Sequence, residues 1–166
     1  PGGKLEKLTD FPDNVASAAF APRHGKYLVY ARDTGGNEAT QVFHMDLATR
    51  QSTLLSGADE RSSFTQAHQS DRLLIASVPL DKTAQGGTRV EVATTLTLVD
   101  PLKPESRQRL VNLPGGGWGS FSFSRDDSTI AAQQYRTPND SDVYLIDAKS
   151  GNREKILPLD GASAAG

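Results

Sequence analysis

The chain has 166 residues and a formal net charge of −2, with 18 Lys and Arg against 20 Asp and Glu. The positive charges form no basic run that could release counterions from a phosphate backbone, so no nucleic-acid partner is expected. The absence of cysteine excludes a disulfide scaffold, a thiolate zinc site and a cysteine nucleophile. No apolar stretch approaches the ~18 residues that span a bilayer, so no membrane partner is expected either.

The chain contains three similar blocks, each with four short apolar or alternating runs separated by polar turns. The run lengths and the periodicity of two are those of β-strands. A four-strand unit that recurs every ~45–50 residues is typical of a β-propeller blade. The runs lie at 15–21, 26–32, 40–47 and 51–56, at 62–68, 72–78, 92–100 and 107–113, and at 118–124, 128–135, 141–147 and 152–159.

This pattern predicts an all-β fold, a partial β-propeller of about three four-stranded antiparallel blades. The blades are expected at 15–57, 62–113 and 118–160, with a flexible tail at 161–166. Residues 1–10 are expected to be the outer strand of a preceding blade, because 3–8 resemble 151–156 in the third block. The alternative is a twelve-stranded sandwich or barrel, which the recurrence of the whole four-run pattern disfavours.

Asp46, Asp100 and Asp147 each close the third run of their block. Asp46 and Asp147 are expected to open hairpin turns, because an Asp side chain bonds to the backbone just after it. Gly151 is suited to a positive φ at the end of the last of these turns.

The first block carries the most specific pattern. Residues 24–63 resemble the propeller of prolyl oligopeptidase-family serine peptidases, in the branch of the acylaminoacyl and dipeptidyl-peptidase-like enzymes. The resemblance rests on a "GKYLVY-x-x-D-x-GGNE-x-x-Q" phrase, an Asp turn, and a Leu-Ser-Gly with a following Arg. These positions are 25–30, Asp33, 35–38, Gln41, Asp46, 55–57 and Arg61. The third block resembles the generic blade phrase that is shared with Tol-type propellers, and the second block matches poorly.

The family's hydrolase domain carries a Gly-x-Ser-x-Gly nucleophile elbow, and this sequence contains none. The resemblance therefore implies a substrate-selecting portion, with no catalytic residue of its own and no peptidase activity by itself. Its implied partners are the hydrolase domain of a parent chain and a peptide substrate.

Loops at one end of the blades carry the candidate binding residues. In a propeller the connections between second and third strands open on one face, together with the connections between blades. That face would contact the hydrolase domain or bind the charged end of a peptide, although turn chemistry and solubility also explain such residues. The candidate residues are Asp33, Asn37, Glu38, Arg61, Asp140 and Asp142.

No cofactor and no metal site is expected. Neither 33–38 nor 139–142 follows the Asp-x-Asp-x-Asp-Gly order of a calcium loop. His24, His44 and His68 are far apart in the sequence and give no zinc pattern. A propeller enzyme with a central metal is accordingly the weakest of the functional classes.

Two functions remain in competition. The first is the non-catalytic propeller of a prolyl oligopeptidase-family peptidase, which gates or selects peptides. The second is a stand-alone Tol-type propeller that binds other proteins. Three blades leave unpaired flanks and apolar surface, so the chain is expected to self-associate, for example as a two-fold pair in a six-bladed ring. The compartment stays open between periplasm and cytoplasm.

Overall fold

The computed structural model describes residues 2–33, 35, 39–88 and 90–158. Over these residues the fold is all-β, with three four-stranded antiparallel sheets in which each strand pairs with the next along the chain. One 3-10 turn, η1 (Thr83–Gln85), interrupts the β6–β7 connection. The strands are β1 Val15–Phe20, β2 Tyr27–Arg32, β3 Gln41–Asp46, β4 Ser52–Leu54, β5 Glu60–Gln66, β6 Leu73–Pro79, β7 Ala93–Asp100, β8 Lys103–Pro114, β9 Trp118–Phe123, β10 Thr129–Thr137, β11 Asp140–Asp147 and β12 Arg153–Leu157.

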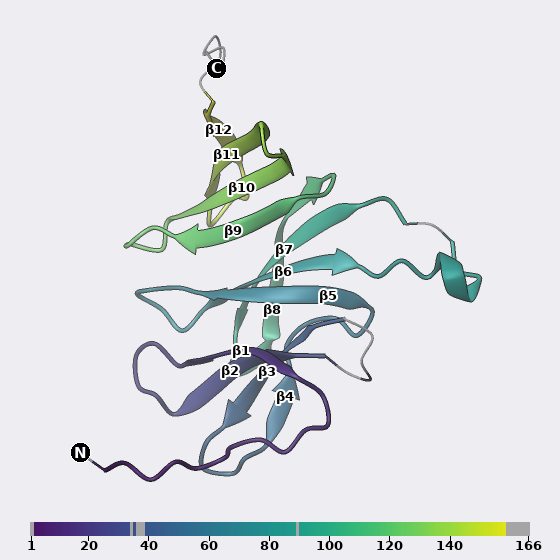
Figure 1. Cartoon of the computed structure of the whole chain (residues 1–166). Helices are drawn as coiled ribbons and strands as arrows, with labels where there is room; N and C mark the ends of the chain where they lie inside the picture. The colour runs from purple at the N-terminus through teal and green to yellow at the C-terminus, as the bar shows by residue number, and fades with distance from the viewer. Residues whose placement is uncertain (1, 34, 36–38, 89, 159–166) are drawn as a thin grey trace.

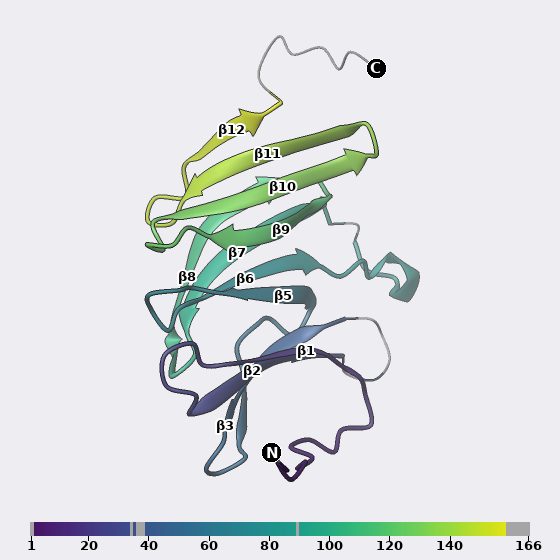
Figure 2. The ribbon, with the colours of Figure 1, turned by 60° about the vertical axis from the view of Figure 1, so that its left-hand side comes forward.

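The sheets stack face to face in chain order, with β1–β4 at one end and β9–β12 at the other (Figures 1 and 2). The first strands β1, β5 and β9 lie one above another along one side of the stack. The chain is thus a partial β-propeller of three blades, as the repeat predicted. None of the described residues forms a helix that could cross a membrane.

The second strands of blades 1 and 2 are the most buried strands of their sheets, which explains their largely apolar sequences. Residues 27–31 of β2 and 73–77 of β6 are all buried, because each strand lies mid-sheet with both faces covered. Alternate side chains of β6 serve two interfaces. Leu73 and Ile75 pack against blade 1, and Leu74 and Ala76 pack against blade 3.

The predicted turns are confirmed. Asp46 Oδ1 accepts the backbone N–H groups of Ala48 and Thr49, both at 2.8 Å. These bonds hold the pKa of Asp46 below its ordinary value. Gly151 has φ of +74°, and a Cβ there would lie 2.5 Å from the Leu110 carbonyl oxygen of the neighbouring blade. Only glycine fits this turn, since both the φ and the close approach exclude a side chain.

Residues 2–14 form no strand. An outer strand needs a sheet to pair with, and the described residues before β1 include none, so the expectation of an outer strand at 1–10 stays a prediction. The segment instead covers the outer face of blade 1, where Leu8 and Phe11 pack on a cluster that includes Leu28 and Tyr30. The rings of Phe11 and Tyr30 stack at 5.7 Å, and Arg32 lies 4.3 Å over Phe11. The opposite end of the stack, the outer face of blade 3, has no such cover among the described residues.

Candidate functional site

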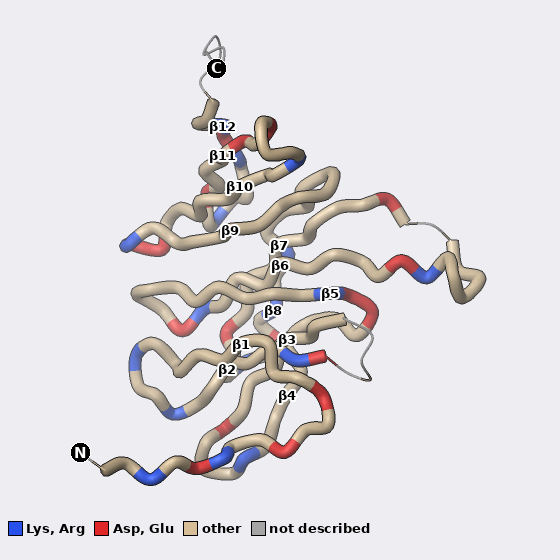
Figure 3. The backbone as a smooth tube through the Cα atoms, viewed as in Figure 1, with Lys and Arg blue, Asp and Glu red and all other residues tan. Residues whose placement is uncertain are grey.

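Three connections lie at the same end of the stack: β2–β3, β6–β7 with its 3-10 turn, and β10–β11 (Figures 1 and 2). This is the end at which the sequence places the candidate binding residues. Charged residues of both signs lie at or beside these connections (Figure 3). Of the six candidates, Asn37 and Glu38 lie outside the described residues, and the other four fall into two separate groups.

The first group is a network of ion pairs on blade 3, which we call the Arg136 cluster: Arg136, Asp140, Asp142 and Lys155. The Arg136 guanidinium makes two bonds to Asp140, at 2.6 and 2.8 Å, and a third to Asp142 Oδ2 at 2.8 Å. Lys155 Nζ lies 3.4 Å from Asp142 Oδ1. The Asp142 side chain is only 10% exposed, so it depends on these cations for compensation.

The electrostatics of the Arg136 cluster follow from its geometry. Hydrogen bonds from Arg136 lower the pKa values of Asp140 and Asp142, and for Asp142 this outweighs the opposite effect of burial. The two carboxylates in turn raise the pKa of Arg136. With each carboxylate already bonded to a cation, the cluster ties β10, β11 and β12 together and leaves little charge for a ligand.

The second group surrounds a hollow of about 390 Å³ on the side of β1, β5 and β9, which we call the Arg61 hollow. Residues of all three blades line it, among them Ser17 of β1, Arg61, Ser63 and Phe64 of β5, and Trp118 of β9. Arg61 is exposed at the start of β5. Asp33 stands at the margin, where its Oδ1 accepts the Thr40 hydroxyl at 3.1 Å, and Thr40 lines the hollow.

Arg61 forms no ion pair or side-chain hydrogen bond with the residues that the structure describes, unlike its acidic neighbours in the chain. Asp59 bonds to Lys82 at 2.7 Å, and Glu60 lies 3.6 Å from Arg107. Trp118 is fixed beside the hollow, because its indole N–H donates to the Pro114 carbonyl at 3.0 Å and its ring packs on Tyr144. The hollow thus combines a fixed apolar wall with an uncompensated cation.

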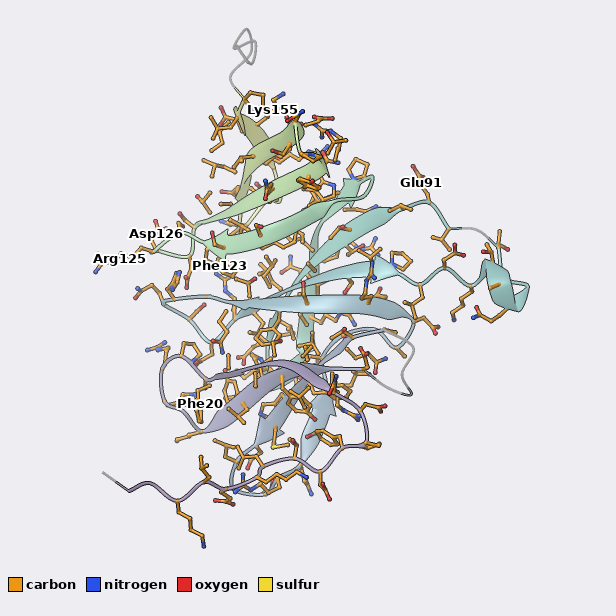
Figure 4. The ribbon with its side chains drawn as sticks, viewed as in Figure 1. Phe20, Glu91, Phe123, Arg125, Asp126 and Lys155 are labelled. Atoms are coloured by element: carbon orange, nitrogen blue, oxygen red, sulfur yellow. The ribbon has the colours of Figure 1, made fainter. Side chains whose placement is uncertain are left out.

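Asp127 is a residue of structural importance that sequence reasoning missed. It lies in the β9–β10 turn beside Arg125 and Asp126, whose side chains mark the tip of that turn in Figure 4. The Asp127 carboxylate is buried and accepts the backbone N–H groups of His68 at 2.6 Å and Gln69 at 2.8 Å, both in the β5–β6 turn of blade 2. Burial alone would raise the pKa of Asp127, but these bonds together lower it below its ordinary value. The carboxylate therefore fastens blade 3 to blade 2.

At the contact between blades 1 and 2, several buried polar groups lack hydrogen-bond partners among the described residues. His24 Nε2 lies 3.8 Å from Asp71 Oδ1, and the Tyr27 hydroxyl and both ring nitrogens of His44 are buried without a hydrogen-bond partner. Burial lowers the pKa of His44, and burial with Asp71 and Asp100 raises the pKa of Tyr27 to about 12. His24 and His44 both meet Tyr27 edge-on. Within the described ranges, no three His, Asp or Glu side chains converge as metal ligands.

Comparison with known proteins identifies the fold of the chain but assigns it to no family. No protein-family model matches the chain. No curated protein matches it either. Several solved structures share its fold. An oligogalacturonate lyase in complex with manganese superposes with a TM-score of 0.66 and 19% identity, over 89% of this chain and 42% of that one.

A prolyl endopeptidase structure superposes with a TM-score of 0.64 and 17% identity, over 95% of this chain and 23% of that one. TolB from Acinetobacter baumannii gives 0.60 and 13% identity, over 89% of this chain and 33% of that one. The chain therefore spans less than half the length of each of these structures. At these identities the likeness establishes the fold alone: the chain has the architecture of part of a β-propeller, one found in prolyl peptidases and in TolB proteins alike.

Proposed function

We propose that the chain is the non-catalytic propeller portion of a prolyl oligopeptidase-family serine peptidase, and that it selects peptide substrates. Support comes from the sequence phrase at 24–63, from the shared fold of a prolyl endopeptidase, and from the Arg61 hollow. Peptide-bond cleavage would proceed by acyl transfer to a serine outside this sequence, since the sequence lacks a nucleophile elbow.

The Arg61 hollow is the observation that carries this proposal. It lies on the side formed by the first strands of all three blades, and its volume is in the range that binds small ligands. Extended peptides offer short apolar side chains, backbone groups and a charged terminus, and the hollow offers small apolar walls, hydroxyl groups and a guanidinium. A folded protein would not fit a space of this size.

The test uses isothermal titration calorimetry to measure whether unstructured peptides and a folded protein bind to the chain. We expect N-acetylated tetrapeptides to bind and a small folded protein not to bind. We expect no cleavage of either ligand by the chain alone. Binding of the folded protein without binding of peptides would contradict the proposal, and so would cleavage of peptides by the pure chain.

A stand-alone Tol-type interaction module is the second candidate function, and the likeness to TolB favours it. The parent reading frame discriminates between the two. A following α/β-hydrolase segment with Gly-x-Ser-x-Gly supports the peptidase, whereas an unrelated following segment supports the interaction module.

We further propose that the chain self-associates through the outer face of blade 3. Leu145 is 37% exposed there and Leu157 is 51% exposed. In blade 2 the residue that corresponds to Leu145 is Leu98, which is buried against blade 3. The cover of residues 2–14 on blade 1 would have to move before a six-bladed ring could close. Light scattering at rising concentration should show a dimer that Leu145→Arg abolishes, and a wild-type monomer at high concentration would contradict the proposal.

A further inference from the structure

We infer that the Arg61 hollow is a carboxylate subsite, which binds a peptide through a carboxylate held by Arg61 with an apolar residue packed against Trp118 and Phe64. This inference rests on the proposed function and names the chemical class of the ligand. It goes further because it assigns peptide recognition to the Arg61 guanidinium and to the apolar wall that Trp118 and Phe64 form.

The charge at the hollow favours an anion. A guanidinium presents a planar fork of donors that matches a carboxylate with two parallel hydrogen bonds. Arg61 is free to do so, because no carboxylate in the described part of the chain lies within ion-pair distance of it. The two nearest carboxylates in the sequence, Asp59 and Glu60, are directed to Lys82 and Arg107 instead.

Neighbouring hydroxyl groups add donors to the same space. The side chains of Ser17 and Ser63 line the hollow, are exposed, and make no hydrogen bond with the described residues. Ser62, between Arg61 and Ser63, also lines the hollow, but its hydroxyl is already bonded to Ser77 at 2.8 Å. The exposed free hydroxyl groups at the hollow are therefore those of Ser17 and Ser63 among the described residues.

The apolar wall of the hollow determines which ligand side chain can lie next to the bound carboxylate. Phe64, Val78, Ala76 and Trp118 line the hollow, and both rings are held by packing or hydrogen bonds elsewhere. A rigid wall costs no side-chain entropy when a ligand binds. An aliphatic side chain beside the carboxylate fits such a wall, whereas a second charge there would be desolvated without a partner.

Trp118 makes the test direct, because it is the only tryptophan in the sequence and it lines the hollow. The probe is N-acetyl-Ala-Ala-Ala-Leu, which does not fluoresce, titrated into the full chain as the free acid and as the C-terminal amide. A third peptide, N-acetyl-Ala-Glu-Ala-Leu amide, carries its carboxylate on a side chain. Comparison of the three distinguishes a chain terminus from an acidic residue as the source of the carboxylate.

We expect the free acid to shift the Trp118 emission and to bind about tenfold or more tightly than the plain amide, because a hydrogen bond to a charged group is among the stronger ones. Arg61→Gln should remove this preference and Arg61→Lys should keep part of it. Arg136→Gln is the matched control, since it changes a paired arginine in another blade and should keep the preference intact.

The outcomes separate this inference from the function on which it rests. Equal affinity of all three peptides for the wild-type chain overturns the carboxylate subsite and leaves peptide selection standing. An acid preference that survives in a folded Arg61→Gln chain also overturns it. No binding of any peptide overturns both the subsite and the proposed function.

Discussion

The Arg136 cluster and the Arg61 hollow differ in whether their charges are already paired. In the Arg136 cluster one guanidinium serves two carboxylates, and a lysine lies close to the more buried of them. At the Arg61 hollow the guanidinium has no partner among the described residues, and its wall is apolar. Both regions were candidate binding sites by sequence, because both place charged residues near the same end of the blades.

The difference shows that a binding site cannot be identified from the number of charged residues at the end of the blades where the loops lie. Paired charges hold strands in place and resist a ligand, because binding would first have to break existing bonds. An unpaired charge beside an apolar wall has no such cost. We therefore expect substitutions at the bonded charges to reduce stability and leave peptide binding unchanged, whereas substitution at Arg61 should weaken peptide binding and leave stability unchanged.

The largest loss of stability is expected at Asp127, a buried carboxylate that accepts hydrogen bonds from His68, Gln69 and Ser70. Asp127→Ala leaves the N–H groups of His68 and Gln69 without an acceptor. We expect the free energy of unfolding to fall by about 1–3 kcal/mol, because partly buried donors would lose a charged acceptor. Urea denaturation measures the loss. Arg125→Ala is the control, since Arg125 lies at the same turn and its side chain is exposed. Equal midpoints for the two variants would refute the fastening role of Asp127.

A smaller loss is expected at Arg136. Arg136→Gln removes the cation from Asp140 and Asp142 and leaves Lys155 as the remaining partner of Asp142. We expect a decrease in the free energy of unfolding that is clearly smaller than the one for Asp127→Ala, because the arginine is partly exposed and solvent weakens its ion pairs. The same urea experiment measures it, with Lys103→Gln as the exposed control. Unchanged stability would show that the ion pairs of Arg136 do not stabilise the fold.

Acid should weaken the paired regions together. The pKa values of Asp127 and Asp142 are lower in the folded chain than their ordinary values, so the folded state binds fewer protons than the unfolded state. Their contribution is complete above the pKa of an unfolded Asp, about 3.9, and is lost as the pH falls through the lower pKa of the folded state. We expect unfolding midpoints to drop below about pH 4, and to drop less in Asp127→Ala. An equal drop in both chains would count against Asp127 as a source of the acid sensitivity.

The smallest effect on stability is expected at Arg61 itself. Arg61→Gln removes no bond that the described residues make, so the free energy of unfolding should change by less than about 0.5 kcal/mol. Thermal unfolding followed by circular dichroism provides the measurement. A clear destabilisation would mean that Arg61 is a structural residue after all, and that its apparent freedom does not indicate a ligand.

The sequence was sufficient for the strands and turns, because their signals are local. Each predicted run overlaps one observed strand, although β8 begins four residues before its run at 107–113, and the turn at Asp46 was expected from that residue and its neighbours alone. The role of Asp127 could not be predicted, since its partners are separated from it by 58 and 59 residues in sequence. The same holds for residues 2–14, where the likeness of 3–8 to a blade strand carried no information on what lies beside them.

The candidate site was predictable only in part, for the same reason. Sequence placed Asp33, Arg61, Asp140 and Asp142 near one end of the blades but gave no sign of which charges would pair. Arg136 was overlooked, although it lies in the same hairpin as Asp140, because pairing depends on how the strands turn. The run at 118–124 was expected to be a strand, but the position of Trp118 against the Arg61 hollow follows from the stacking of β9 on β5.

The most direct test of the comparison is a residue-by-residue map of where a peptide binds. The backbone amide resonances of the labelled chain would be followed by NMR as N-acetyl-Ala-Ala-Ala-Leu is added. We expect the backbone amide resonances of Arg61, Ser63 and Phe64 and the indole N–H resonance of Trp118 to shift with one common affinity. The amide resonances of Arg136, Asp140 and Asp142 should stay unchanged. Shifts confined to the Arg136 cluster, with the Arg61 hollow silent, would contradict this expectation.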